Sequence, residues 1–214
     1  MMEHAAKLTE EDWGDVDKEN KFGSGRYAAV YPARRKNDEY FETVDSEAGE
    51  QRPDRQQWLE RCDCALKVVD KNQFWRRVVK GRERADTLVR EPSVQSTLTA
   101  LCGKVPTFLK LRGFFETSDN IVMELELLEG TDLFDYVSSK GVLGEDEAAV
   151  IMRDVLKSLE AMNRVGLAHR DIKPANVLMC SREQNGVSVK VGDFGMSTFV
   201  GVDGLVRGRC GMYN

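Results

Sequence analysis

Histidine and proline are scarce in this chain of 214 residues, which has two histidines and five prolines. With histidine present only at His4 and His169, a metal site of mixed cysteine and histidine ligands is not expected. The five cysteines are odd in number, and Cys62 and Cys64 stand one residue apart, which fits neither a zinc knuckle nor a thioredoxin-type pair. We therefore expect free thiols in a reducing compartment.

Long apolar runs and an excess of basic charge are missing as well. No uninterrupted apolar stretch is long enough to span a bilayer, and the first residues resemble no signal peptide. The formal net charge of -5 gives the chain no electrostatic reason to bind nucleic acid or anionic membrane. The one local basic run, residues 76–84, is interpreted as a solvated helical face. We expect no nucleic-acid or membrane partner and a cytoplasmic or nuclear location.

The composition, with 41% hydrophobic and 31% charged residues, is that of one globular domain or of two small lobes. Residues 1–20 are acidic and polar, which indicates a short lead-in to the domain. Residues 34–61 are polar and lack periodicity, so they are interpreted as a surface insertion between two strands. Helical composition over residues 74–101 is interrupted by Pro92. Short apolar segments predict strands at residues 21–31, 64–69, 108–111 and 120–125.

Helices dominate the second half of the chain. A short helix is expected after Gly130, with Thr131 as its N-cap. From Gly144 to about Asn163, apolar residues recur every three or four positions, and three acidic residues occupy the first turn, where the helix dipole favours them. This apolar stripe consists of Ala148, Ile151, Val155, Leu159 and Met162. A strand-rich half followed by a helical half predicts an α+β fold with two lobes.

A glycine motif lies near the start of the domain. Gly23, Ser24 and Gly25, followed by Ala28 and Val30, predict a tight turn between two strands, here called the glycine turn (residues 23–28). Glycines in such a turn let the backbone approach phosphates without side chains in the way. By itself the pattern also suits an ordinary hairpin turn.

Lys67 is a charged residue within the apolar segment at residues 64–69. Burial alone would drive its ammonium group neutral, so a buried Lys67 needs an anionic partner such as a phosphate or a carboxylate. A lysine at a strand end that reaches out to solvent is the alternative interpretation.

The most specific pattern is the segment Leu-Ala-His-Arg-Asp-Ile-Lys-Pro-Ala-Asn-Val-Leu at residues 167–178. Asn176 follows Asp171 by five residues, and the triplet Asp-Phe-Gly begins at Asp193, about 20 residues further on. In this order, after a glycine turn and a strand lysine, the two segments resemble the catalytic loop and the second metal-binding triplet of eukaryotic-type serine/threonine protein kinases.

The resemblance implies a protein-kinase-like fold of two lobes. The N-lobe would be an antiparallel sheet with one helix at residues 21–128, and residues 129–214 would form an incomplete helical C-lobe. Residues 207–214 resemble the close of an activation segment, and no Ala-Pro-Glu triplet follows, so the kinase domain is expected to be truncated there. The apolar stripe of the helix at residues 144–163 would then lack much of its packing partner, and a stabilising protein partner is expected.

The implied activity is transfer of the γ-phosphate of ATP to a serine or threonine hydroxyl of a protein substrate, with Mg²⁺ as the metal. Two alternatives remain open. The chain could be a catalytically inactive nucleotide-binding or regulatory kinase fragment, or a small-molecule phosphotransferase of kinase-like fold.

The resemblance also implies a role for each matching residue. Asp171 would be the general base for the substrate hydroxyl, and Lys173 would contact the phosphoryl group in transfer. Asn176 and Asp193 would supply oxygen ligands to Mg²⁺. Lys67 would hold the α- and β-phosphates of ATP.

The adenine site is matched to residues 123–130. Leu125 is placed at the gatekeeper position, with Met123 as the alternative, and the backbones of Glu126 and Leu128 would bind the purine edge. The apolar walls of the purine site would be Val30, Ala65 and Leu178.

One part of the family pattern is ambiguous in this sequence. Glu91 is the best candidate for the helix carboxylate that pairs with Lys67, and Glu83 is its rival. Pro92 follows Glu91 directly, so the helix either starts there or is kinked there. Gln95, one turn further on, stands where relatives place an apolar residue.

Overall fold

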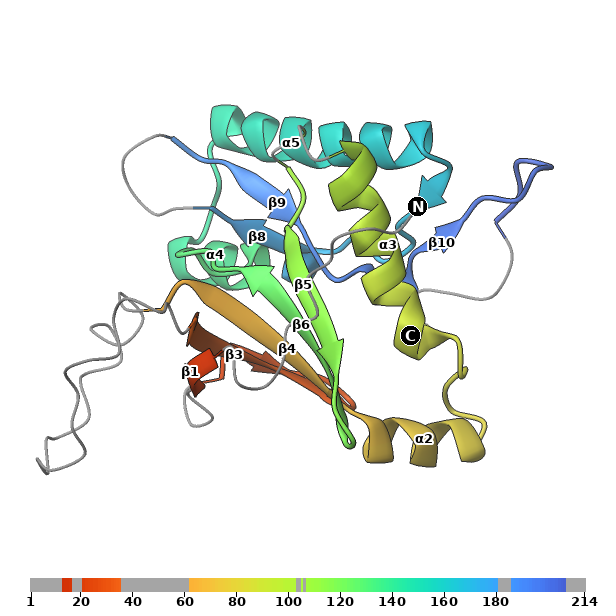
Figure 1. The fold of residues 1–214 in the computed structure, drawn as a ribbon. Helices are drawn as coiled ribbons and strands as arrows, with labels where there is room; N and C mark the ends of the chain where they lie inside the picture. The colour runs from red at the N-terminus through yellow and green to blue at the C-terminus, as the bar shows by residue number, and fades with distance from the viewer. Residues whose placement is uncertain are drawn as a thin grey trace, which may run out of the picture. The chain divides into compact units, whose positions relative to one another are not determined.

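The computed structural model describes residues 13–16, 21–35, 62–102, 105, 107–180 and 186–206. Two regions discussed above lie outside the described residues. They are most of the expected insertion at residues 34–61 and all of residues 207–214, which include Cys210. Figure 1 shows the course of the chain. The four cysteines in the described part, Cys62, Cys64, Cys102 and Cys180, form no disulfide with one another. No helix in that part combines the length and the apolar composition that crossing a membrane requires.

The chain divides into two compact units, Met1–Glu83 with Leu111–Leu127, and Arg84–Lys110 with Leu128–Asn214. The α+β class is confirmed, since strands dominate the first unit and helices the second. Residues 84–110, which the expected lobe at 21–128 included, group with the second unit instead. The reason is that the helix within them packs against the segment around Phe194.

The first unit is built on an antiparallel sheet of six strands, in the order β1-β3-β4-β6-β5 with β2 paired to β3 (Figure 1). Its core cluster consists of small and medium apolar side chains from β3, β4 and β6. The strands are β1 (Trp13–Val16), β2 (Gly23–Ser24), β3 (Ala28–Arg35), β4 (Cys64–Asp70), β5 (Leu111–Glu116) and β6 (Asn120–Glu126).

Three of the four predicted strand segments are confirmed in this sheet: residues 21–31 as β2 and β3, residues 64–69 as β4, and residues 120–125 as β6. The fourth, at residues 108–111, is wrong, because β5 begins only at Leu111. The preceding residues bond elsewhere: the Leu109 amide donates to Val191 O at 3.0 Å, and the Val191 amide donates to Thr107 O at 2.9 Å.

The helical composition at residues 74–101 corresponds to two helices, α2 (Lys71–Val79) and α3 (Thr87–Cys102). Asp70 caps α2 by accepting a hydrogen bond from the Gln73 amide at 2.8 Å. The basic run at residues 76–84 extends from the end of α2 into the following turn, and most of its basic side chains are exposed, as predicted.

The second unit contains α3, two further long helices and two small two-stranded sheets, β8–β9 and β7–β10. Its elements after α3 are α4 (Leu133–Lys140), α5 (Glu145–Arg164), β7 (Leu167–Ala168), the 3-10 helix η2 (Pro174–Asn176), β8 (Val177–Met179), β9 (Val189–Val191), the 3-10 helix η3 (Phe194–Met196) and β10 (Thr198–Phe199).

Of the two alternatives for the helix around Pro92, a start at the proline is excluded, because α3 begins at Thr87 and runs through Pro92. The expected N-cap of the next helix is wrong. Helix α4 is capped by Asp132, whose carboxylate accepts from the Asp135 amide at 2.9 Å, and not by Thr131. Aspartate accepts this bond as readily as threonine, so both residues were compatible with the pattern.

Helix α5 matches the predicted helix at residues 144–163 and carries its three acidic residues in the first turn. The expectation that its apolar stripe lacks a packing partner is wrong. Ile151, Val155 and Met162 are 2%, 4% and 1% exposed, because they pack in a core shared with β7, β8 and β9. The apolar side chains of α5 that do remain exposed are Met152 and Leu156, which lie outside the stripe.

Candidate active site

One face of the sheet in the first unit carries several predicted site residues. Val30 of β3 and Met123 of β6 both pair directly with Lys67 of β4, and Ala65 pairs with Leu125. Residues directly opposite each other in antiparallel strands project to the same face, and so do residues two apart along one strand. Val30, Ala65 and Lys67 therefore share a face, together with both candidates for the gatekeeper position.

The glycine turn is confirmed as a tight turn between β2 and β3. Gly23 pairs with Val30 and Ser24 with Ala29, and the Gly25 amide donates to Ala28 O at 2.7 Å. Residues 23–26 are exposed, so the backbone of the turn is open to a ligand.

The two residues expected to bind the purine edge lie where the chain passes from one unit to the other. Glu126 is the last residue of β6 and pairs with Cys64. The boundary between the units falls between Leu127 and Leu128.

The second unit brings together three of the residues assigned to catalysis and metal binding. The Lys173 ammonium nitrogen lies 2.8 Å from Asp171 Oδ2. The Asn176 side-chain nitrogen donates to the backbone oxygen of Asp171 at 2.8 Å and to its Oδ2 at 3.1 Å. One carboxylate oxygen therefore receives two donors, which fix its direction.

His169 connects this loop to the segment before Asp193. The Asp171 amide donates to His169 Nδ1 at 3.3 Å, and His169 Nε2 lies 3.1 Å from Gly192 O. Because Nδ1 accepts, the ring proton is on Nε2, which donates to the glycine carbonyl. The side chain is 2% exposed, and burial lowers the pKa of His169, which keeps the ring neutral.

Asn176 and Asp193 lie at the same end of the β8–β9 pair. Val177 pairs with Val191, and the Gly192 amide donates to Asn176 O at 2.9 Å. Since the Asn176 amide nitrogen is directed at Asp171, its oxygen is the group left to accept a cation. An amide oxygen and a carboxylate are ligands that Mg²⁺ accepts together with phosphate oxygens, so the donor set fits a divalent metal.

Backbone strain marks both loops. Arg170 has φ 70° and Asp193 has φ 57°, and they are the non-glycine residues with positive φ in the described part of the chain. Such left-handed conformations are uncommon for residues with a Cβ and are concentrated at functional sites. The Arg170 Nε atom donates to Met196 O at 2.7 Å, which connects the two strained segments.

Glu91 lies beside the Asp-Phe-Gly triplet. A Cβ atom added to Gly195 would stand 3.6 Å from Glu91 Oε2 and 3.4 Å from Asp193 Oδ1. Whether Glu91 or Glu83 is the partner of Lys67 stays a prediction. Leu178, the expected apolar wall, is half-buried on β8.

The middle residue of the Asp-Phe-Gly triplet packs among residues that carried no recognisable signal in the sequence. Phe194 is fully buried, with its ring centroid 5.3 Å from that of His169 and 6.2 Å from that of Phe108. The Ser197 hydroxyl, also fully buried, donates to His169 O at 3.3 Å. Phe108 and Ser197 belong to no motif, and their roles depend on long-range packing.

The chain matches the family model described as protein kinase domain over residues 59–213, more than half of its length. It therefore belongs to the protein kinase family, whose members use ATP and a divalent metal and act on proteins.

Curated relatives support the same family. The chain is 31% identical over 147 residues to the serine/threonine-protein kinase RAD53 of Saccharomyces cerevisiae, an alignment of 69% of this chain and 16% of that protein. It is 34% identical over 136 residues to calcium-dependent protein kinase 29 of Arabidopsis thaliana, covering 64% and 24%. A probable myosin light chain kinase of Dictyostelium discoideum is 26% identical over 198 residues, covering 92% and 51%. The chain thus spans about half or less of the length of these relatives.

Proposed function

We propose that this chain transfers the γ-phosphate of ATP to serine or threonine hydroxyl groups of protein substrates, with Mg²⁺ as the metal. The observation that carries the proposal is the convergence of Lys173 and Asn176 on one oxygen of Asp171. The names of the curated relatives, among them serine/threonine-protein kinases, support the choice of acceptor.

Asp171 acts as the general base. Its Oδ2 atom is held by two donors, and its side chain is 15% exposed, so the carboxylate is oriented and still accessible. An acceptor hydroxyl that donates its proton to this carboxylate becomes a better nucleophile towards the γ-phosphorus.

Lys173 has two roles in this proposal, to orient Asp171 and to contact the phosphoryl group. It fixes Asp171 through the 2.8 Å contact, and its side chain is 33% exposed, so the ammonium can also reach a phosphoryl oxygen. A positive charge there stabilises the negative charge of the phosphoryl group in transfer.

Asn176 and Asp193 would hold the metal through oxygen atoms. Mg²⁺ held there would supply positive charge that neutralises part of the charge of the phosphates. The hydrogen bonds from Asn176 to Asp171 make one amide serve two functions, since its nitrogen orients the base and its oxygen is left for the cation.

The nucleotide is assigned to the residues that the family resemblance implies. Lys67 pairs with the α- and β-phosphates, and the glycine turn with Gly23, Ser24 and Gly25 approaches phosphate oxygens through its backbone. Glu126 and Leu128 bind the purine edge. The apolar walls are Val30, Ala65 and Leu178.

The test is phosphate transfer from labelled ATP by the purified chain to peptide pools that carry serine, threonine or tyrosine as the acceptor. Serine and threonine pools are expected to be labelled, and Asp171→Asn should lower kcat by about 10²- to 10⁴-fold, the usual contribution of general-base catalysis. Asp135→Asn, at an exposed position in the first turn of α4, is the matched control and should change kcat less than twofold.

Three outcomes would contradict the proposal in different ways. Labelling of tyrosine pools alone would overturn the acceptor class. Equal loss of activity in Asp135→Asn and Asp171→Asn would overturn the role of the base. Binding of ATP without any transfer would favour a catalytically inactive nucleotide-binding fragment.

A further inference from the structure

Helix α2 begins at the end of the sheet where two turns of the first unit are found. In β3, Ala28, the last residue of the glycine turn, pairs with Val69 of β4. On its other edge β4 pairs with β6, where Asp70 lies opposite Asn120, the first residue of β6. The glycine turn, the start of α2 and the β5–β6 turn (residues 117–119) therefore lie at one end of the sheet.

On one side, α2 contacts the glycine turn. The Asp70 amide donates to Tyr27 O at 2.9 Å, which fixes the backbone of the turn to the N-cap of the helix. The Tyr27 ring packs edge to face on Phe74, with ring centroids 5.1 Å apart and an interplanar angle of 82°. Phe74 is fully buried, so the ring that receives Tyr27 is itself held in place.

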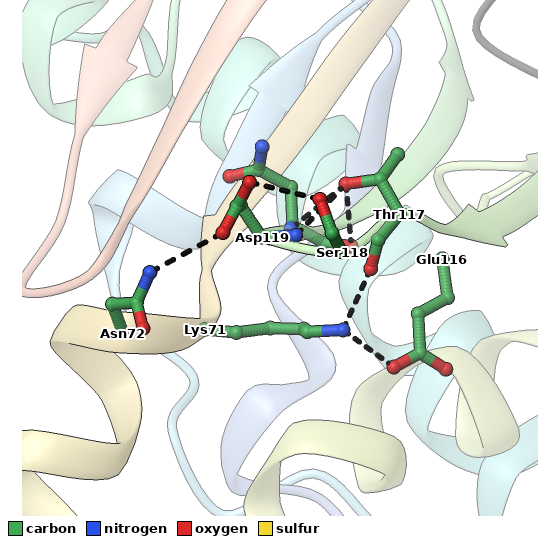
Figure 2. Close-up of polar contacts among 7 residues, drawn as sticks. Lys71, Asn72, Glu116, Thr117, Ser118 and Asp119 are labelled. Carbon is green, nitrogen blue, oxygen red and sulfur yellow. Dashed lines mark hydrogen bonds and ion pairs between the residues drawn. The ribbon is translucent and has the colours of Figure 1, made fainter.

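On the other side, α2 contacts the β5–β6 turn, as Figure 2 shows. The Lys71 ammonium lies 2.7 Å from Glu116 Oε1 and donates to Thr117 O at 2.6 Å. Its backbone amide donates to Asp119 O at 2.9 Å, and the Asn72 side chain reaches the Asp119 carboxylate at 3.5 Å. The first turn of α2 is thereby anchored to the sheet independently of the glycine turn.

A glycine-containing turn that binds phosphates loses conformational entropy when it becomes ordered. A turn that is already held near its bound geometry loses less on binding, and its ligand binds more tightly. Tyr27 lies inside the turn, between Gly25 and Ala28, so a contact at its ring and its carbonyl restrains the turn directly.

We propose that helix α2 pre-orders the glycine turn through Phe74 and Tyr27, which act as positioning residues for nucleotide binding. The proposal rests on the proposed function, since it deepens the role of the glycine turn in holding ATP. The proposal assigns different effects to the two contacts of α2. The contact between Tyr27 and Phe74 affects the affinity for nucleotide, whereas the contacts of Lys71 affect only the stability of the fold.

The experiment compares Phe74→Leu, Tyr27→Leu and Lys71→Met in the full chain. Removing either ring should weaken ATP binding, measured as Kd and as KM, by about two- to tenfold, the range expected for one aromatic pair, with kcat changed less than twofold. In the double variant Tyr27→Leu/Phe74→Leu the losses should not add, because both single changes remove the same contact. Tyr27→Phe retains the ring and should recover the affinity that Tyr27→Leu loses.

Lys71→Met is the matched control on the same helix. It should lower Tm and leave the Kd and KM for ATP within twofold. If Phe74→Leu folds poorly, Tyr27→Leu decides the question, because Tyr27 is only half-buried. Additive losses in the double variant, or equal shifts in Kd for Lys71→Met and Tyr27→Leu, would overturn the proposal.

Amide hydrogen exchange of residues 23–28 separates failure of this inference from failure of the proposed function. The amides should exchange faster in Tyr27→Leu than in Lys71→Met, whether or not nucleotide is present. If the unaltered chain binds no Mg-ATP, the proposed function is lost, while the exchange comparison still decides whether α2 holds the turn. Equal exchange in the two variants would overturn the inference by itself.

Discussion

The side-chain amide of Gln95 donates a hydrogen bond of 2.8 Å to the backbone oxygen of Leu109. Gln95 is 2% exposed, and the Leu109 amide in turn donates to Val191 O at 3.0 Å. Helix α3 is thus connected to β9, two residues before Asp193, through a buried polar bond. At the position where the family resemblance implied an apolar residue, Gln95 holds the helix by a hydrogen bond.

Replacing Gln95 by methionine should lower the free energy of unfolding by about 1–3 kcal/mol, because the buried oxygen of Leu109 loses its side-chain donor while the side-chain volume stays similar. Urea unfolding measures the change. Gln73→Met on α2 is the control: it removes an exposed hydrogen bond, from Gln73 Nε2 to Asp70 Oδ2 at 2.8 Å, and should cost less than Gln95→Met. A Gln95→Met protein as stable as the unaltered chain would show that apolar packing compensates the lost bond.

Two glycine substitutions should change the free energy of unfolding in opposite directions. A Cβ atom at Gly130 would clash with the backbone oxygen of Met179, so Gly130→Ala forces the backbones apart and should cost about 1–3 kcal/mol or more. Gly144, the N-cap of α5, has open space at its Cβ and makes no side-chain cap bond. Gly144→Ser should therefore raise the free energy of unfolding by a few tenths of a kcal/mol to about 1 kcal/mol. Thermal unfolding of both variants checks the pair, and a stabilised Gly130→Ala protein would contradict the close approach.

Ser158 anchors α5 to the segment before β5. Its fully buried hydroxyl lies 2.8 Å from Thr107 O and 3.1 Å from Asp154 O. Ser158→Ala should cost about 1–2 kcal/mol, measured by urea unfolding, because a buried carbonyl loses its donor. Ser138→Ala on the exposed face of α4 should change stability by less than about 0.5 kcal/mol. Equal effects at the two serines would argue against the anchor.

The stability of the fold should depend on the protonation of His169. Burial lowers the pKa of this ring from its ordinary value of 6.5, so the unfolded chain binds more protons than the folded chain below about that pH. Stability is therefore fully present above pH 6.5 and declines as the pH falls below that value. Urea unfolding at pH 7.5, 6.5 and 5.5 should show this decline.

A His169→Gln variant supplies the control for this pH dependence. Its stability should vary less over the same interval, because it lacks the titrating ring. The carboxylates whose pKa is lowered, Asp70, Asp86 and Glu147, lose their contribution only at more acidic pH, near their ordinary values of 3.8 to 4.5. An identical pH dependence in the variant and the unaltered chain would contradict the assignment to His169.

The sequence was sufficient to predict the structure of those short segments whose own residues determine it. The apolar run at residues 64–69 forms β4, and the periodic pattern with acidic residues in its first turn forms α5. The loop containing Asp171, Lys173 and Asn176 could be predicted because it resembles the catalytic loop of protein kinases, and the structure brings these three side chains together.

Long-range contacts account for what could not be predicted. Residues 108–110 are apolar enough for a strand, but their backbone bonds to β9 and not to the sheet of the first unit. The apolar stripe of α5 was expected to be uncovered, yet β7, β8 and β9 bury it, and no feature of the α5 sequence specifies that partner. The glycine turn was recognised from its own residues, whereas its contact with Phe74 depends on how α2 leaves β4.

Arg170 and Asp193 hold left-handed backbone conformations, which cost a residue with a Cβ about 1–2 kcal/mol each. Glycine at either position would relieve that cost, although Arg170→Gly would also remove the bond from Arg170 Nε to Met196 O. A descendant of this chain that no longer needed the proposed phosphate transfer would be under less constraint to keep the two side chains. Glycine at these two positions would thus be an early mark of decay into a pseudoenzyme.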